Sequence, residues 1–166
     1  MVVGVSAATP RGPATRSGLV VGARGEILTF GRAPTGSRLR VARADGQSMA
    51  AIVLGRVGDL PLVLVRAEGD LAGAMVARPG SRFPRAHGRV LRIAWRAAGA
   101  EASLGSVYAP PDVRGRAEVD VPGELGAALF DGAGRWIGVG LDERRRRSRF
   151  AAADRLIEPM QAMVRA

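Results

Sequence analysis

The residues that could perform acid–base or nucleophilic chemistry are few in this sequence. Its 166 residues include one histidine, His87, and no cysteine. The lack of cysteine excludes disulfides, thiolate metal sites and cysteine nucleophiles, and one histidine excludes a multi-histidine metal site. We therefore expect no metal and no cofactor. The hydroxyls of Ser6, Ser17, Ser103 and Ser106 could be nucleophiles, but each is better interpreted as an ordinary strand or turn residue.

The charge of the chain is strongly basic. All 25 positions counted as Lys or Arg hold arginine, against 15 acidic residues, for a net charge of +10. Exclusive use of arginine beside many Ala and Gly residues is typical of a GC-rich genome. The net charge is thus weak evidence for nucleic-acid binding, although it permits non-specific polyanion binding. The densest cluster is Arg144 to Arg147, followed by Arg149, a block typical of a solvated loop or a polyanion contact.

Short apolar runs separated by turn residues are the main structural signal. They lie at 2–5, 19–21, 26–30, 38–43, 49–54, 60–65, 90–95, 104–108, 117–121, 127–130 and 136–141. Asp45-Gly46 and the segment 131–134 are typical of hairpin turns, because glycine adopts a positive φ without a Cβ clash. Short strands at this spacing favour an all-β barrel or sandwich.

The C-terminus is the only segment with helical periodicity. Leu156, Met160 and Val164 fall on one face, and Asp154 is suited to the N-cap. Pro159 would lie inside such a helix, where it removes a backbone donor. A helix that begins at Pro159 is therefore the alternative.

Several motifs follow one another in a recognisable order. They are VVGVS (2–6), SGLVV (17–21), GEILT (25–29), DLPLVLV (59–65), PGELGAALF (122–130), RWIGV (135–139) and FAAA (150–153). In order and spacing they resemble the HtrA/Deg family of trypsin-like serine proteases, whose corresponding motifs include VVGV, ILTN-HVV, TDLALLKV, PGNSGGPLV and FAIP. The resemblance covers nearly the whole chain.

The resemblance implies a fold and a location. The expected fold is all-β, a trypsin-like double six-stranded β-barrel with a short C-terminal helix, within one domain of residues 1–166. Its parts would be an N-terminal barrel (1–67), a linker (68–88), a C-terminal barrel (89–152) and a helix (153–166). The family implies the cell envelope or periplasm of a bacterium. No signal peptide is visible, and the apolar runs are far shorter than the ~20 residues of a membrane span.

The catalytic positions of the family are occupied by other residues here. Asp59 occupies the carboxylate position, but Arg32 lies where the family has its histidine, and Leu125 where it has its serine. Arginine cannot act as a general base near neutral pH, and leucine has no hydroxyl. The Gly-Pro that follows the nucleophile is Ala127-Ala128, which also puts the oxyanion hole in doubt. The resemblance thus implies a pseudoprotease.

Each of these positions has a second interpretation. Asp59 either forms an ion pair with Arg32 or is a turn residue before a strand. Leu125 either fills the vacated site or is exposed in a ligand groove, and the first is favoured. His87 is better interpreted as a solvated loop histidine than as a displaced base.

The segment 136–141 resembles the strand of the family that pairs with substrate. We expect an extended peptide to bind there, at Gly138, Val139, Gly140, Leu141 and Asp142. Arg144, Arg145, Arg146 and Arg147 follow as candidate anion-binding residues, which would recruit an acidic peptide, obstruct the groove, or form a solvated loop.

The function that these observations predict is that of a catalytically inactive HtrA-like module that binds or scaffolds peptides or proteins. The alternative is polyanion or nucleic-acid binding through the arginine-rich loop. Steep salt dependence would favour the alternative, and salt-tolerant binding of extended peptides would favour the module. No arrangement of residues supports a rewired enzyme, and nothing in the sequence indicates an oligomeric state.

Overall fold

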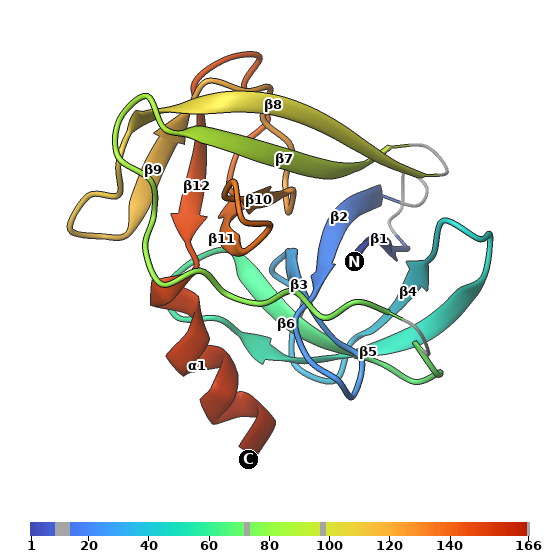
Figure 1. Cartoon of the computed structure of the whole chain (residues 1–166). Helices are drawn as coiled ribbons and strands as arrows, with labels where there is room; N and C mark the ends of the chain where they lie inside the picture. Colours follow the sequence, from blue (N-terminus) through green and yellow to red (C-terminus); the bar gives the residue numbers. More distant parts are fainter. Residues whose placement is uncertain (9–13, 72–73, 97–98, 166) are drawn as a thin grey trace.

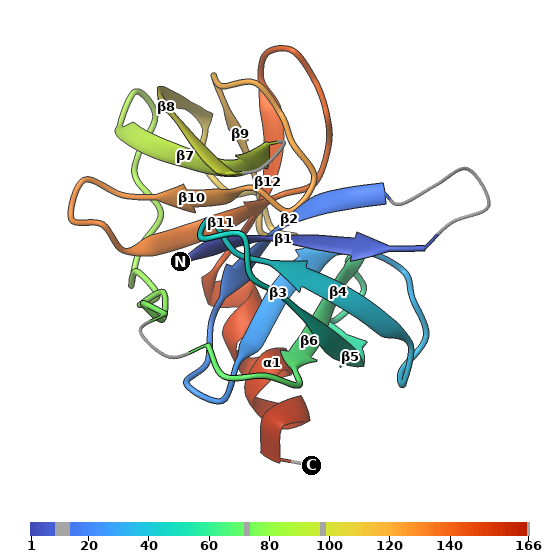
Figure 2. The same ribbon diagram turned by 90° about the vertical axis from the view of Figure 1, so that its right-hand side faces the viewer.

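The strands form two closed antiparallel barrels (Figures 1 and 2). The computed structural model describes residues 1–8, 14–71, 74–96 and 99–165. The N-terminal barrel contains β1 (Val2–Ala7), β2 (Ala14–Val20), β3 (Glu26–Phe30), β4 (Arg38–Ala42), β5 (Ser48–Arg56) and β6 (Leu62–Ala67), in the spatial order β1-β2-β3-β6-β5-β4. The C-terminal barrel contains β7 (Arg89–Arg96), β8 (Gly99–Ala109), β9 (Arg116–Val119), β10 (Ala128–Phe130), β11 (Trp136–Gly140) and β12 (Ser148–Ala152), in the order β10-β11-β12-β9-β8-β7. The predicted double six-stranded barrel is confirmed.

The local patterns in the sequence account for many of these strands. In β4, Leu39 and Val41 are buried while Arg38 and Arg40 are exposed, as a period of two requires. The turn between β4 and β5 places Gly46 at a φ of +83°, as the Asp45-Gly46 pair predicts.

One strand, β12, is not among the apolar runs given above, and it begins with the polar residues Ser148 and Arg149. It is held between β11 and β9, with Phe150 buried and the Ser148 hydroxyl donating to the Val121 carbonyl oxygen over 2.8 Å. Only the resemblance of residues 150–153 to a family motif indicated it. Its polar residues are explained by pairing partners that are distant in the sequence.

A shared core joins the two barrels. Leu28 and Leu64 of the N-terminal barrel belong to the same buried cluster as Trp95 and Trp136 of the C-terminal barrel. At the junction, the buried Ser17 hydroxyl accepts the backbone N–H of Trp95 over 2.7 Å. Because these contacts are buried and directional, they fix how the barrels face each other.

The helix α1 (Asp154–Arg165) leaves the C-terminal barrel after β12 and runs along the side of the N-terminal barrel (Figure 1). It begins at Asp154 and contains Pro159, so the alternative start at Pro159 is wrong. The proline removes one helical hydrogen bond. Burial of Leu156 and Met160 in the shared core offsets that loss.

Candidate functional site

The three positions that resemble the catalytic triad lie on separate connections. Arg32 follows β3 and is exposed, Asp59 is exposed in the turn before β6, and Leu125 is half-buried in the loop between β9 and β10. No ion pair joins Arg32 to Asp59 in the part of the chain that the structure describes. Of the two interpretations of Asp59, the ion pair is therefore absent from the described residues, and Asp59 is a turn residue. Its exposure leaves it in water, where a carboxylate needs no partner.

The loop that carries Leu125 packs tightly against both barrels. The Gly126 N–H donates to the Gly140 carbonyl oxygen (3.0 Å), and the Gly140 N–H donates to the Ala127 carbonyl oxygen (2.8 Å). Gly126 has a φ of +81°, and a Cβ there would lie 2.1 Å from the Ser17 carbonyl oxygen. The loop is thus closed onto β2 and β11, while Leu125 itself is only half-buried and does not fill the site as a core residue.

An oxyanion hole needs backbone N–H groups that point at one open position. In this loop the Gly123 N–H donates to the Arg144 carbonyl oxygen over 2.6 Å. A Cβ on Gly123 would lie 2.6 Å from the Asp142 carbonyl oxygen, so the two loops are in direct contact. This donor is therefore already engaged inside the protein.

A neighbouring acid holds the same loop in place. The Glu124 carboxylate lies 3.0 Å from the Arg96 guanidinium of β7. Burial raises the pKa of Glu124 above its usual value, and the nearby positive charges of Arg96 and Arg92 oppose that shift. The contact ties Glu124, the residue before Leu125, to the C-terminal barrel.

The arginine-rich loop is partly engaged by its own surroundings. Asp142 accepts from the Arg149 Nε over 3.0 Å and lies 3.2 Å from the Arg144 Nε. The Arg147 guanidinium lies 4.0 Å from the centroid of the Tyr108 ring. Arg145 and Arg146 are exposed. The four predicted anion-binding residues therefore do not form one equivalent patch.

An ion pair crosses from the N-terminal barrel to this loop. The Arg16 Nη1 on β2 lies 3.2 Å from the Glu143 carboxylate, and the Arg16 guanidinium lies 5.6 Å from the centroid of the Phe30 ring. These contacts bridge β2 and the segment that follows β11. Any ligand that enters between them has to displace a salt bridge.

The predicted peptide edge is free only at its end. Gly138 and Val139 are buried and pair with β10 on one side and with β12 on the other. Both backbone groups of Gly140 bind the loop at Gly126 and Ala127. The expectation for these three residues needs correction, because no backbone edge is left for a peptide. Leu141 and Asp142 are half-buried, and the Leu141 N–H donates to the Arg149 carbonyl oxygen over 2.9 Å. The peptide interaction stays a prediction at these two positions.

The remaining candidate residues, His87 and the four serines, lie in turns and strands of the fold. His87 is exposed in a turn before β7, with a φ of +66°, and it does not line the hollow beside Asp59. The hydroxyl of Ser103 accepts from the Arg92 Nε over 2.8 Å, and Ser17 holds the barrel junction. Ser6 and Ser106 are half-buried in β1 and β8.

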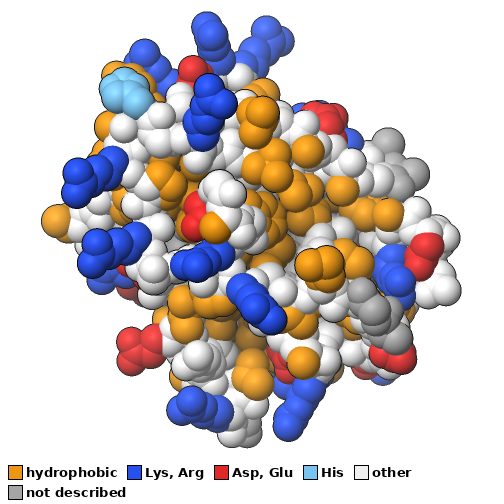
Figure 3. All heavy atoms as spheres, in the orientation of Figure 1, with side chains coloured by type: hydrophobic (Ala, Val, Ile, Leu, Met, Phe, Trp, Pro, Cys, Tyr) orange, Lys and Arg blue, Asp and Glu red, His pale blue; other side chains and the backbone are white. Residues whose placement is uncertain are grey.

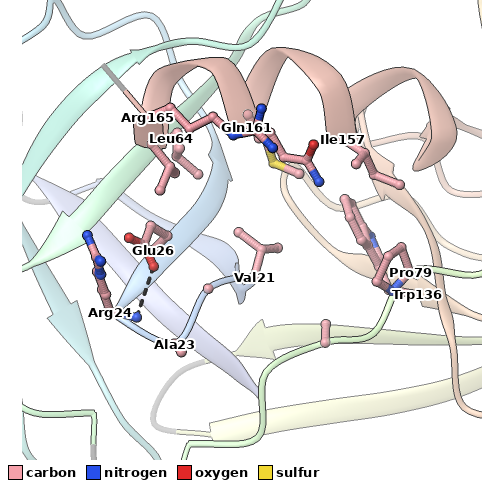
Figure 4. A pocket seen from close by; sticks show the side chains of 14 residues that line it. Val21, Ala23, Arg24, Glu26, Leu64, Pro79, Trp136, Ile157, Gln161 and Arg165 are labelled. Atoms are coloured by element: carbon pink, nitrogen blue, oxygen red, sulfur yellow. Dashed lines mark hydrogen bonds between the residues drawn. The ribbon is translucent and has the colours of Figure 1, made fainter.

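A cavity of about 720 Å³ lies between α1, the β2–β3 turn and the linker before β7 (Figure 4). Its apolar walls include Leu64, Trp136 and Ile157, and Arg24 and Arg165 also line it. The Glu26 carboxylate points inward and accepts the Arg24 backbone N–H over 3.0 Å. No local pattern in the sequence indicated this cavity, which holds none of the three triad positions.

The surface agrees with the basic composition. On the face shown in Figure 3, basic side chains outnumber acidic ones. Within residues 1–8, 14–71, 74–96 and 99–165, no group of three or more His, Cys, Asp or Glu side chains is placed to hold a metal ion. No helix in that part of the chain is long and apolar enough to cross a membrane.

Two closed six-stranded barrels followed by a helix define the trypsin-like class of fold. In comparisons with known proteins, no family profile matches the chain, and no curated protein matches it either. Solved structures of HtrA-type proteases do match. The protease AlgW with a tripeptide matches with a TM-score of 0.79 and 21% identity, over 98% of this chain and 60% of that one.

Two further structures agree with this likeness. The serine endoprotease from Yersinia pestis matches with a TM-score of 0.81 and 18% identity, over 99% of this chain and 62% of that one. AlgW with a decapeptide matches with a TM-score of 0.78 and 18% identity, over 99% and 64%. The domain therefore has the fold of HtrA-type proteases, and it spans less than two thirds of the length of these chains.

Proposed function

We propose that this domain is a catalytically inactive relative of HtrA-type proteases that binds peptide or protein segments without cleaving them. The observation that carries the proposal is the absence of nucleophile and base at the positions that resemble the triad. Leu125 has no hydroxyl, and Arg32 has no nitrogen able to take a proton. Catalysis of acyl transfer needs both groups within hydrogen-bond reach of each other.

The backbone around Leu125 supports the same conclusion. A developing oxyanion is stabilised by N–H groups that are free until substrate arrives. The Gly123 N–H is already bound to the Arg144 carbonyl oxygen. Restoring a serine and a histidine would therefore leave this donor occupied.

Peptide binding would use the segment after β11. Leu141 and Asp142 are the predicted edge residues that remain half-buried, and the similar protease AlgW has been solved with a tripeptide and with a decapeptide. A peptide at this edge competes with the bridge between Arg16 and Glu143. Binding is therefore expected to be weak and to favour an extended acidic segment, whose carboxylates replace Glu143 at Arg16. A cell-envelope location belongs to the same proposal.

The alternative function is polyanion binding through the exposed Arg145 and Arg146. Arg144 and Arg147 already have partners in Asp142 and Tyr108. If this alternative holds, the logarithm of affinity should fall with the logarithm of salt concentration with a slope of about two, because the slope follows the number of phosphates neutralised.

Activity is tested with a serine-directed phosphonate and an unfolded protein substrate. We expect no covalent labelling and no hydrolysis, both in the unaltered chain and in the double variant Arg32→His, Leu125→Ser. Stoichiometric labelling of any serine in the unaltered chain would contradict the proposed inactivity.

Peptide binding is tested by titration of extended acidic peptides while backbone amide shifts are recorded. We expect the response at Leu141 and Asp142, with tighter binding in Glu143→Gln because the bridge to Arg16 is lost. Glu158→Gln, which removes an exposed acid on α1, is the matched control and should bind as the unaltered chain does. A response elsewhere only, or none, would reject this edge as the binding site.

A further inference from the structure

Three segments that are far apart in the sequence enclose a second pocket. The turn between β5 and β6, the loop before β9 and the first turn of α1 form a cavity of about 440 Å³. Asp59, Arg114, Arg116 and Arg155 supply its charged lining, with Leu60 and Leu156 among its apolar residues. The three segments lie on the same side of the molecule in Figure 1. The pocket contains no part of the peptide edge proposed above.

The three arginines of this pocket have no acidic partner among the described residues, in contrast to the arginines that form ion pairs elsewhere. Ion pairs elsewhere engage Arg16, Arg43, Arg66, Arg92, Arg96, Arg144 and Arg149. Arg114, Arg116 and Arg155 form no ion pair within the described ranges, and neither does Asp59. Three guanidinium groups and one carboxylate leave a net charge of +2 around the cavity.

The loop before β9 is built to hold two of these arginines in place. The Asp112 carboxylate accepts the backbone N–H of Arg114 and that of Arg116, each over 2.9 Å. These bonds, with the one to Arg116 the larger cause, keep the pKa of Asp112 below its usual value. The loop therefore keeps this geometry at neutral pH without help from a ligand.

Two of the side chains are positioned further by contacts of their own. The Arg116 Nε is buried and has no hydrogen-bond partner among the described residues. A Cβ on Gly115 would lie 2.5 Å from the Arg155 Cγ, so the stem of Arg155 packs directly over Gly115. An unsatisfied buried donor costs free energy unless an acceptor reaches it.

We propose that this pocket binds a phosphate monoester. Guanidinium groups bind tetrahedral oxyanions through paired N–H donors, and arginine suits such recognition better than lysine. A phosphate monoester carries a charge of about −1.5 to −2 at neutral pH, which matches the net charge of the pocket. The cavity exceeds the size of the phosphate group, and Leu60 and Leu156 offer an apolar surface for the carbon portion of the ester.

Asp59 allows a test that is specific to this pocket. Its carboxylate lines the same cavity and repels a bound anion, because it has no ion-pair partner to neutralise it. Removing that charge should therefore strengthen phosphate binding. A pocket that served only to balance Asp59 would show no such gain.

The test is a titration with inorganic phosphate at constant ionic strength, with chloride as the balancing anion. We expect saturable amide shifts at Arg114, Arg116 and Leu156 that chloride does not produce. Arg116→Gln and Arg155→Gln should each weaken binding about tenfold or more, because each removes hydrogen bonds to a charged group. Asp59→Asn should tighten it severalfold.

The matched control is Arg38→Gln, which removes an exposed arginine of β4 and should leave affinity unchanged. Arg155 and Asp59 are exposed, so their variants test the site even if Arg116→Gln does not fold. Equal weakening of phosphate binding by Arg38→Gln and Arg155→Gln would overturn the proposal. It would mean that affinity follows the net charge of the protein and not the residues of this pocket. If Arg145→Gln abolished binding while the pocket variants did not, the proposal would also be overturned, and the binding site would be the arginine-rich loop.

Two further probes distinguish a small phosphate ester from a phosphorylated protein segment as the ligand. Glycerol phosphate represents a small ester, and a phosphoserine peptide, compared with its unphosphorylated form, represents a modified protein segment. Tighter binding of glycerol phosphate than of the peptide assigns the site to small esters. The reverse order assigns it to a phosphorylated partner.

Discussion

At the scale of single residues, Gly126 determines whether the loop beside Leu125 can close onto β2. It adopts a φ of +81°, and the space where a Cβ would stand is filled by the Ser17 carbonyl oxygen at 2.1 Å. The φ alone would favour glycine, as it does at Gly46 in the β4–β5 turn. The two positions differ in their surroundings, because nothing lies within 4 Å of a Cβ on Gly46.

This difference yields a paired prediction. Gly46→Ala should lower the free energy of unfolding by about 1–2 kcal/mol, the cost of a left-handed conformation. Gly126→Ala should lower it by a further ~1–3 kcal/mol, because the backbone of β2 has to move as well. Denaturant unfolding measures both. Equal losses would mean that the loop shifts freely and is not held against β2.

Arginine residues also diverge in role according to their neighbours. Arg92 is buried and paired with Glu101 at 3.3 Å, whereas Arg155 has no acidic partner within the described residues. A surface pair of arginine and acid contributes little to stability. The functional interest therefore lies with the unpaired arginines that share a cavity, and a count of arginines along the chain does not reveal them.

At the scale of elements, α1 forms with a proline inside it. Pro159 lies in the second turn, where its ring crowds the preceding turn and its nitrogen donates no hydrogen bond. Leu156 and Met160 compensate by packing into the core shared by the barrels. The helix therefore forms because of its packing, although one of its residues disfavours a helical conformation.

Replacement of this proline should stabilise the protein. Pro159→Ala is expected to raise the free energy of unfolding by about 1–3 kcal/mol, because the restored hydrogen bond and the relieved crowding outweigh the greater freedom of the unfolded chain, which opposes the gain. Glu158→Ala, an exposed neighbour, should change it by less than about 0.5 kcal/mol. Thermal or denaturant unfolding distinguishes them. A loss of stability in Pro159→Ala would show that the proline ring makes a contact that the helix needs.

The strand β11 shows how an element limits a site. A strand at the edge of a sheet accepts an extended peptide through free backbone groups. β11 lies between β10 and β12, so Gly138 and Val139 have none to offer. The Leu141 N–H is also engaged, by the Arg149 carbonyl oxygen at 2.9 Å, so an added peptide has to pair beyond it, at Asp142.

At the scale of the whole molecule, the two barrels share one core. Leu28, Leu64, Trp95 and Trp136 belong to a single buried cluster that also includes Leu156 of α1. Neither barrel could separate without exposing that surface to water. We therefore expect the barrels to unfold together.

A substitution in one barrel tests this coupling. Ile27 belongs to a core within the N-terminal barrel, while both tryptophans of the chain lie in the C-terminal barrel. Ile27→Ala should lower stability by about 2–5 kcal/mol. The shift should be equal by circular dichroism, which follows both barrels, and by tryptophan fluorescence, which follows the C-terminal barrel and its junction with the N-terminal barrel. An unchanged fluorescence transition would mean that the barrels unfold independently.

The sequence by itself determined what depends on near neighbours along the chain. Alternation in residues 38–43 and the glycine at position 46 predicted a strand and its turn, because burial period and φ are local properties. The order of motifs indicated the double barrel. It also indicated β12, in which two polar residues precede the short apolar segment 150–152.

Tertiary structure alone decided which groups meet. Arg16 and Glu143 are 127 positions apart and form a bridge only because the barrels face each other. Arg114 and Arg116 join Arg155 and Asp59 at a pocket for the same reason. The block Arg144 to Arg147 looked uniform in the sequence, yet Arg144 contacts Asp142 and Arg147 contacts Tyr108, although all four are exposed. Such pairings form only when the barrels close. Closure depends on many contacts between residues far apart in the sequence, and no local pattern encodes these contacts.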